Sequence, residues 1–122
     1  MSHQLLLLNA DEQTMFCKDD VLQTLQSVRG LHGLQEGTSL GSVLRGVFEF
    51  QGDTTTVELS DDLKRISLSG TGVAALQIAL ELKEKLSIPL RAFDSSYTFD
   101  VLLNAVHDLY DFQSKITEGE GV

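Results

Sequence analysis

The sequence predicts an α+β fold, a two-layer sandwich in which helices pack on one face of a mixed sheet. Residues 54–59 alternate between apolar and polar side chains, which is the period of a half-buried strand. Residues 73–86 instead place apolar side chains three and four positions apart, which is the period of a helix with one covered side. With the flanking segments, these patterns predict the order strand, helix, three strands, helix, strand, helix.

The N-terminal part predicts a strand followed by a helix. Residues 4–9 include four consecutive leucines and fit an interior strand that is covered on both faces. Asp19 can cap a helix that ends at Gly30, because apolar residues recur between them at helical spacing. Residues 31–46 interleave glycines with leucines, and we expect an ordered loop or a short helix that docks on the core.

The centre of the chain predicts a three-stranded antiparallel meander, with strands at residues 47–51, 54–59 and 64–68. Gly52-Asp53 suits a type II′ turn between the first two strands, which sets Phe48 opposite Val57. Asp61-Asp62 favours the second turn, which sets Val57 opposite Ile66. Both registers place the apolar side chains on one face, so the two turns support each other.

The C-terminal part predicts a helix, a strand and a second helix. The helix at 73–86 leads into a short strand at 88–93, and a right-handed crossover follows if the strands before and after that helix are parallel in one sheet. A last helix is expected to begin near Thr98, and residues 117–122 are expected to form a frayed tail. The apolar residues that predict this helix are Phe99, Leu102, Leu103, Val106 and Tyr110.

Length and charge limit the classes of function. The chain has 122 residues and is expected to form one domain, residues 1–122. Its net charge is −9, which argues against nucleic acid and anionic membranes and favours a basic protein partner. The sequence shows no membrane span or signal peptide and has one cysteine, Cys17, which we expect to be buried or inert. A cytoplasmic location is therefore expected.

The outward side of the meander is the main candidate for a binding surface. One face of an antiparallel sheet is commonly left to solvent, and here that face would carry charged and hydroxyl side chains. Such a surface suits a basic protein or a second copy of the chain. Its residues are Glu49, Thr54, Thr56, Glu58, Arg65 and Ser67.

Asp94-Ser95-Ser96 follows a predicted strand and precedes a predicted helix, where capping explains the three residues. The triplet also resembles the Asp-Ser-Ser of anti-sigma-factor antagonist domains, whose serine is phosphorylated between a strand and a helix. The resemblance covers these three residues, and Tyr97 stands where that family has glycine. It implies a regulatory domain that is switched by phosphorylation at Ser95 or Ser96.

Two further features suggest an enzyme or a ligand-binding domain. The loop Ser69–Gly72 precedes a helix, and its backbone amides could hold an anion. His107 or Cys17 could act in a small enzyme with acids that the fold brings near. His107 and Asp111 have a spacing that can grip a metal, but a solvated helix face explains them, and no metal or cofactor is expected.

No convergent catalytic set is visible in the sequence. We therefore expect a small acidic, non-enzymatic protein-binding module of the kind found in the bacterial cytoplasm. An immunity or antitoxin-like protein that occludes a basic partner fits these traits at the level of class. A phosphorylation-switched regulator and a small enzyme remain the alternatives.

Overall fold

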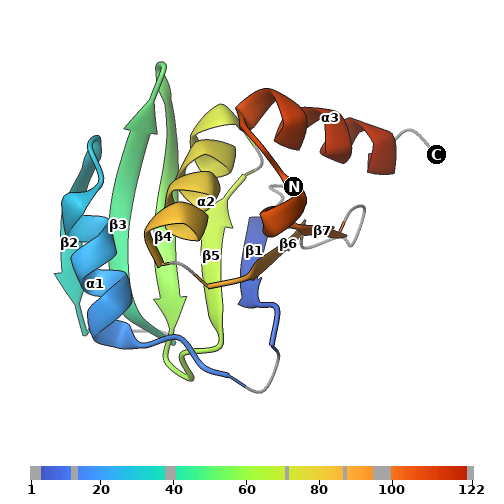
Figure 1. Ribbon diagram of the computed structural model, residues 1–122. Helices are drawn as coiled ribbons and strands as arrows, with labels where there is room; N and C mark the ends of the chain where they lie inside the picture. Colours follow the sequence, from blue (N-terminus) through green and yellow to red (C-terminus); the bar gives the residue numbers. More distant parts are fainter. Residues whose placement is uncertain are drawn as a thin grey trace.

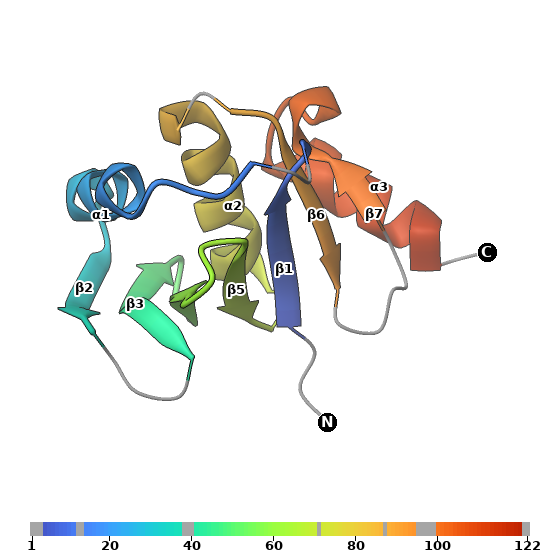
Figure 2. The same cartoon turned by 90° about the horizontal axis from the view of Figure 1, so that it is seen from below.

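The computed structural model describes residues 4–11, 14–37, 41–70, 72–86, 88–94 and 100–120, and it confirms the α+β class (Figure 1). In chain order its elements are β1 (Gln4–Asn9), α1 (Lys18–Ser27), β2 (Leu31–Glu36), β3 (Ser42–Phe50), β4 (Asp53–Ser60), β5 (Arg65–Ser69), α2 (Val73–Leu86), β6 (Leu90–Asp94), β7 (Asp100–Leu102), the 3-10 helix η1 (Leu103–Ala105) and α3 (Leu109–Glu120). Figure 2 shows α1 and α2 on one side of the sheet and α3 at its β6–β7 end.

The seven described strands form one sheet in the order β2-β3-β4-β5-β1-β6-β7. Every pair of neighbouring strands is antiparallel, so the prediction of a mixed sheet is wrong, although one isolated parallel bridge joins Gln4 to Gly70. Strands β5 and β6 run in the same direction around α2, as the expected crossover requires. They are not neighbours, because β1 lies between them and pairs with both.

The first turn of the meander lies one residue earlier than predicted. Phe48 is opposite Thr55, not Val57, and Gln51-Gly52 forms the turn instead of Gly52-Asp53. Gln51 and Gly52 have φ of 52° and 80°, and a type I′ turn requires positive φ at both central positions. The register moves by two residues, so each side chain stays on its predicted face.

The pairing across the second turn also differs from prediction by two residues, but here it moves later in the chain. Val57 is opposite Leu68, and Ile66 is opposite Leu59, which again is a shift of two residues. The connection is longer than a tight turn, and Leu63 within it has a φ of 62°. The backbone oxygen of Leu63 accepts a 2.7 Å hydrogen bond from the N–H of Phe16, which fastens this connection to the segment before α1.

Residues 31–46 form strand β2 and the first half of β3, not the loop or short helix that we expected. The pairing of β2 with β3 is irregular between His32 and Gln35, and Gly33 and Gly37 both have a φ of 66°. A bulge of this kind breaks the alternation of apolar and polar side chains. The strand therefore has no clear period in the sequence.

The expected helix from Thr98 is also wrong, because residues 100–105 form β7 and η1 and the helix begins at Leu109. Two tertiary hydrogen bonds hold this segment in place. The Asn104 side-chain oxygen accepts from the N–H of Leu90 at 3.2 Å, and the Lys83 ammonium donates to the Val106 carbonyl at 3.0 Å. Helix α3 continues to Glu120, across residues 117–120 of the expected tail, and 121–122 lie outside the described residues.

The core lies between the sheet and the helices, and α2 contributes most of the helical part of it. The seven buried residues of α2 are Ala74, Ala75, Leu76, Ile78, Ala79, Leu80 and Leu82. The sheet opposes them with fully buried side chains that include Leu5, Leu7, Phe48 and Ile66. None of the helices in the described ranges is long and apolar enough to span a bilayer.

Candidate functional site

The six residues of the predicted binding surface lie together on one side of the sheet. That side faces away from α1 and α2 (Figure 2). The cross-strand partners of the six residues show this, because residues directly opposite each other point to the same face. Glu49 is opposite Thr54, and Glu58 is opposite Ser67. We call this side the open face. It is the side opposite buried Leu44, Phe48, Val57, Leu59, Ile66 and Leu68.

Glu58 has different neighbours from those expected. The predicted register sets it opposite Arg65, but its ion-pair partner is Arg45, with 3.4 Å between Nε and Oε1. Ser42 Oγ also donates to its second carboxylate oxygen at 3.1 Å. Arg65 instead lies opposite Leu8 of β1. Both oxygens of Glu58 are therefore engaged within the chain, which makes this carboxylate part of the surface structure.

Two further ion pairs cross strands on the open face. The Glu49 carboxylate lies 3.9 Å from Nε2 of His32, an ion pair when the imidazole is protonated. Arg91 Nε lies 2.8 Å from Asp100 Oδ1, between β6 and β7. The exposed members of such pairs are expected to contribute only about 0–1 kcal/mol each to stability.

The half of the open face formed by β1, β6 and β7 is partly apolar. Leu6 and Leu8 are half-buried, although both point away from the helices, and Leu102 at the sheet edge is 47% exposed. Arg91 lies between Leu8 and Leu102 in one row across these strands. No local pattern in the sequence indicates this grouping, since only the order of strands in the sheet places β1 and β6 beside the meander.

The Ser69–Gly72 loop precedes α2, as predicted, but an acidic side chain already occupies the helix N-terminus. Asp53 Oδ2 accepts a 3.1 Å hydrogen bond from the N–H of Ala74. A bound anion would have to compete with this carboxylate for the same backbone donors. Thr71, in the middle of the loop, lies outside the described residues.

The residues proposed for an enzyme do not converge. Cys17 was expected to be buried or inert; it is exposed before α1, so it is not buried, and its inertness stays a prediction. His107 lies in the connection between η1 and α3, where its backbone N–H donates to Asp111 Oδ2 at 2.9 Å. No three His, Cys, Asp or Glu side chains within the described ranges are grouped so that they could hold a metal ion. Ser95 and Ser96, the candidates for phosphorylation, lie outside the described residues.

One carboxyl group has a clearly shifted pKa. The hydroxyl of Ser60 donates to Asp62 Oδ1 at 2.6 Å, and the N–H of Lys64 donates to the same oxygen at 3.1 Å. These two bonds, with the nearby charges of Arg65 and Lys64, hold the pKa of Asp62 below its usual value of 3.8. The group lies in the connection between β4 and β5, where these hydrogen bonds join residues 60, 62 and 64.

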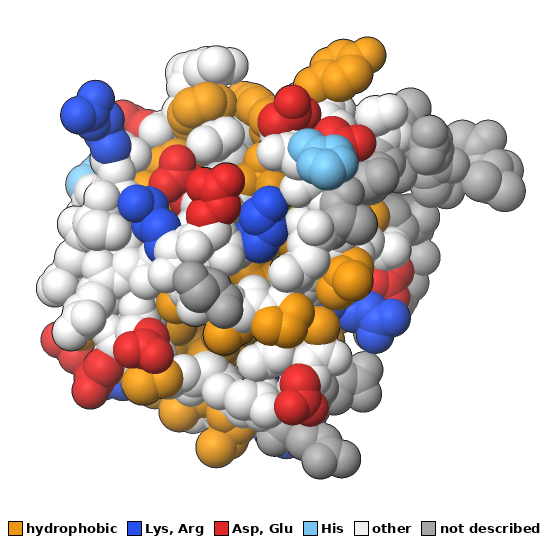
Figure 3. All heavy atoms as spheres, viewed as in Figure 1, with side chains coloured by type: hydrophobic (Ala, Val, Ile, Leu, Met, Phe, Trp, Pro, Cys, Tyr) orange, Lys and Arg blue, Asp and Glu red, His pale blue; other side chains and the backbone are white. Residues whose placement is uncertain are grey.

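Two of the hollows that described residues line lie beside the helices. One, of about 190 Å³, lies where the start of α3 meets α2, and its lining includes His107, Asp108 and Glu81. The other, of about 340 Å³, lies between α1 and β2. Figure 3 shows that charged side chains of both signs are scattered over the side that carries α1 and α2, with hydrophobic side chains visible between them. Comparisons with models of protein families, with curated proteins and with solved structures find no match to this chain.

Proposed function

We propose that this chain is a small, non-enzymatic protein-binding module of the cytoplasm that engages its partner through the open face of the sheet. The observation that carries the proposal is the arrangement of the layers. Helices α1 and α2 lie on one side of the sheet (Figure 2). The other side carries half-buried leucines and charged side chains. An apolar patch with a polar surround is the usual composition of a protein interface.

The charge of the open face refines the expected partner. Strands β3 to β7 present three arginines and three acids there, whereas the chain as a whole has a net charge of −9. These residues are Arg45, Arg65, Arg91, Glu49, Glu58 and Asp100. A basic partner, as expected of an immunity or antitoxin-like protein, would be steered to the molecule by its overall charge. Short-range complementarity on the face would then require charges of both signs.

The experiment combines partner capture with a matched pair of charge reversals. Glu49→Lys changes the open face, and Glu84→Lys makes the same change in net charge on the exposed side of α2. A partner captured by the wild-type chain should bind Glu49→Lys roughly tenfold more weakly and Glu84→Lys with little change. Glu58 is unsuitable for this purpose, because its replacement also breaks the contacts with Arg45 and Ser42.

Equal binding by both charge variants would reject the open face as the interface. Salt supplies a second readout, since steering by overall charge predicts an association rate that falls as salt rises. The alternatives make different predictions. A phosphorylation-switched regulator requires that phosphate at Ser95 or Ser96 abolishes capture, and a small enzyme requires a reaction that His107→Ala or Cys17→Ala removes while the fold is kept.

A further inference from the structure

The open face carries charges of both signs in equal number, although the chain as a whole is strongly acidic. The sequence has 18 acids and nine lysines and arginines, and three of each are on this face. The other 15 acids and six bases therefore carry all of the net charge of −9. Two copies that approached each other through those residues would bring acidic surfaces together. An approach through the open face avoids that repulsion at the contact.

Two of the three acids on the open face already have arginine partners within the chain. Arg45 Nε lies 3.4 Å from Glu58 Oε1, and Arg91 Nε lies 2.8 Å from Asp100 Oδ1. A face whose charges are compensated in this way is complementary to a surface that is itself close to neutral and carries both signs. A second copy of the same face is such a surface.

Leucines lie between the charges in the half of the face formed by β5, β1, β6 and β7. Leu8 is opposite Arg65 on one side and Arg91 on the other, and Leu102 follows Arg91 in the same row. Leu6 lies two residues before Leu8 on the same face of β1. Leu6 and Leu8 are half-buried and Leu102 is exposed, so their apolar atoms are available to a covering surface. Apolar side chains with charged neighbours are typical of the centre and rim of an interface.

The order of these side chains fits a second copy in one orientation. In a two-fold dimer of sheets stacked face to face, the axis lies in the plane between them and each contact occurs twice. An axis along β1 would place β5 of one copy over β6 of the other, so that Arg65 meets Arg91. An axis across the strands, between Leu6 and Leu8, instead sets these two leucines against each other and Arg65 against Ser67. Like charges are then kept apart.

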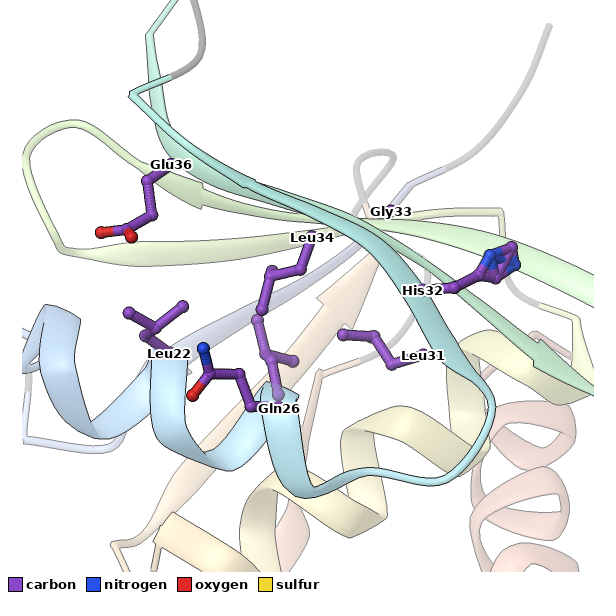
Figure 4. A pocket seen from close by; sticks show the side chains of 8 residues that line it. Leu22, Gln26, Leu31, His32, Gly33, Leu34 and Glu36 are labelled. Carbon is purple, nitrogen blue, oxygen red and sulfur yellow. The ribbon is translucent and has the colours of Figure 1, made fainter.

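The face extends across the described sheet and is large enough for a dimer. At the β2 edge His32 is opposite Val47, and Figure 4 shows the His32 ring directed away from Leu34, which lies in the gap toward α1. With strands about 4.8 Å apart and a rise of about 3.3 Å per residue, seven strands of about six residues form a face of roughly 29 by 20 Å. Two such faces bury roughly 1,200 Å², the lower end of the range for specific interfaces.

We propose that a second copy of the chain covers the open face when no other partner is bound. The dimer is a face-to-face pair of sheets with Leu6, Leu8 and Leu102 at the contact. This inference rests on the proposed function, because both assign the open face as the interface.

Sedimentation equilibrium of the full chain tests the dimer. At a chain concentration of roughly 100 µM a reversible dimer should be populated. Its association should strengthen when NaCl is raised from about 20 mM to about 300 mM, because salt screens the repulsion between two copies that each carry −9. A complex with a basic partner should weaken over the same range, so the sign of the salt effect distinguishes the two kinds of association.

A matched pair of variants locates the contact. Leu102 and Tyr110 are both exposed large hydrophobic residues, but Tyr110 lies on α3, outside the sheet. Leu102→Lys and Tyr110→Lys change the net charge equally. Leu102→Lys should weaken the dimer roughly tenfold or more, and Tyr110→Lys less than about twofold. Leu8→Lys, closer to the proposed axis, should weaken it at least as much as Leu102→Lys, and circular dichroism checks that each variant is folded.

Three results would overturn the inference. They are a monomer at both salt concentrations, a dimer that weakens as salt rises, and a dimer that Tyr110→Lys dissociates as strongly as Leu102→Lys. None of them rejects the proposed function, which capture of a partner by Glu49→Lys and Glu84→Lys tests separately. Equal capture by those two variants would in turn reject the proposed function while a dimer sensitive to Leu102→Lys still supports the second copy.

Discussion

The hydrogen bond between Asp53 and α2 gives a sharp test of how the sheet and the central helix are joined. Asp53 begins β4, and its half-buried carboxylate caps the first turn of α2 at Ala74 from 21 residues away in the sequence. Loss of a helix N-cap costs about 0.5–2 kcal/mol. Asp53→Ala should therefore lower the free energy of unfolding by about 1–2 kcal/mol, or the Tm by roughly 3–10 °C for a chain of this size.

Gly72 provides an independent way to break the same contact. A Cβ atom at Gly72 would lie 2.5 Å from Asp53 Oδ2, so the carboxylate must move away to make room for it. Gly72→Ala should then cost about as much as Asp53→Ala, because both remove one cap. The double variant should be about as stable as either single variant, since both substitutions remove the same hydrogen bond to Ala74.

Urea unfolding followed by circular dichroism measures all four proteins under one condition, and equal m-values would validate the comparison. Asp53→Asn is the control, because the amide oxygen can still accept the hydrogen bond while the charge is removed. It should lose less than Asp53→Ala. Additive effects of Asp53→Ala and Gly72→Ala, or an effect of Asp53→Ala below about 0.3 kcal/mol, would refute the cap as described.

Two further predictions concern a glycine and a carboxylate. Gly30→Ala should destabilise the fold by about 2–3 kcal/mol, because φ is +94° and the new Cβ would lie 2.6 Å from the Glu49 backbone oxygen. Gly37→Ala should cost about 1 kcal/mol, since its φ is +66° but no atom lies within 4 Å of the new Cβ. If urea unfolding gives Gly37→Ala a loss as large as that of Gly30→Ala, the contact with Glu49 is not what makes Gly30 necessary. Because the pKa of Asp62 is lowered in the folded chain, its contribution to stability is present above the usual carboxyl range and is lost as the pH falls through the lowered pKa. Between about pH 5 and pH 2 the wild type should therefore lose more stability than Asp62→Asn. Parallel stability profiles of the two proteins over this range would show that the Ser60 and Lys64 hydrogen bonds to Asp62 contribute nothing to stability.

Local patterns predicted which face of the meander is buried, but not the exact pairing of its strands. Both turns differ from prediction, and each moves the register by two residues. A shift of two preserves the alternation, so Thr55 and Val57 are buried under either register. Hydrophobic pattern alone cannot distinguish the two registers. The choice depends on turn geometry, as at Gln51, a residue type that rarely adopts positive φ.

Tertiary contacts decided the structure of residues 100–105, which were predicted to be part of a helix. Leu103 and Val106 are buried, but in a 3-10 helix and the connection after it, where contacts with Lys83 and Leu90 replace those of a regular helix. The six residues of the predicted binding surface do lie on one face, because the alternation of side chains along each strand was enough to predict it. The other members of that face, including Leu6 and Arg91, could not be found, since the position of β1 between β5 and β6 is a property of the whole sheet.

The inner position of β1 also has a consequence for synthesis of the chain. Leu5 lies opposite Leu68, 63 residues later, and opposite Asp94, 89 residues later. At a translation rate of roughly 5–20 residues per second, its second neighbour is made about 4–18 s after the leucine run itself. Until β5 is made, a strand with four consecutive leucines has neither of its partners, and until β6 is made one of its edges stays unpaired, so this segment of the nascent chain is one on which a chaperone would have reason to act.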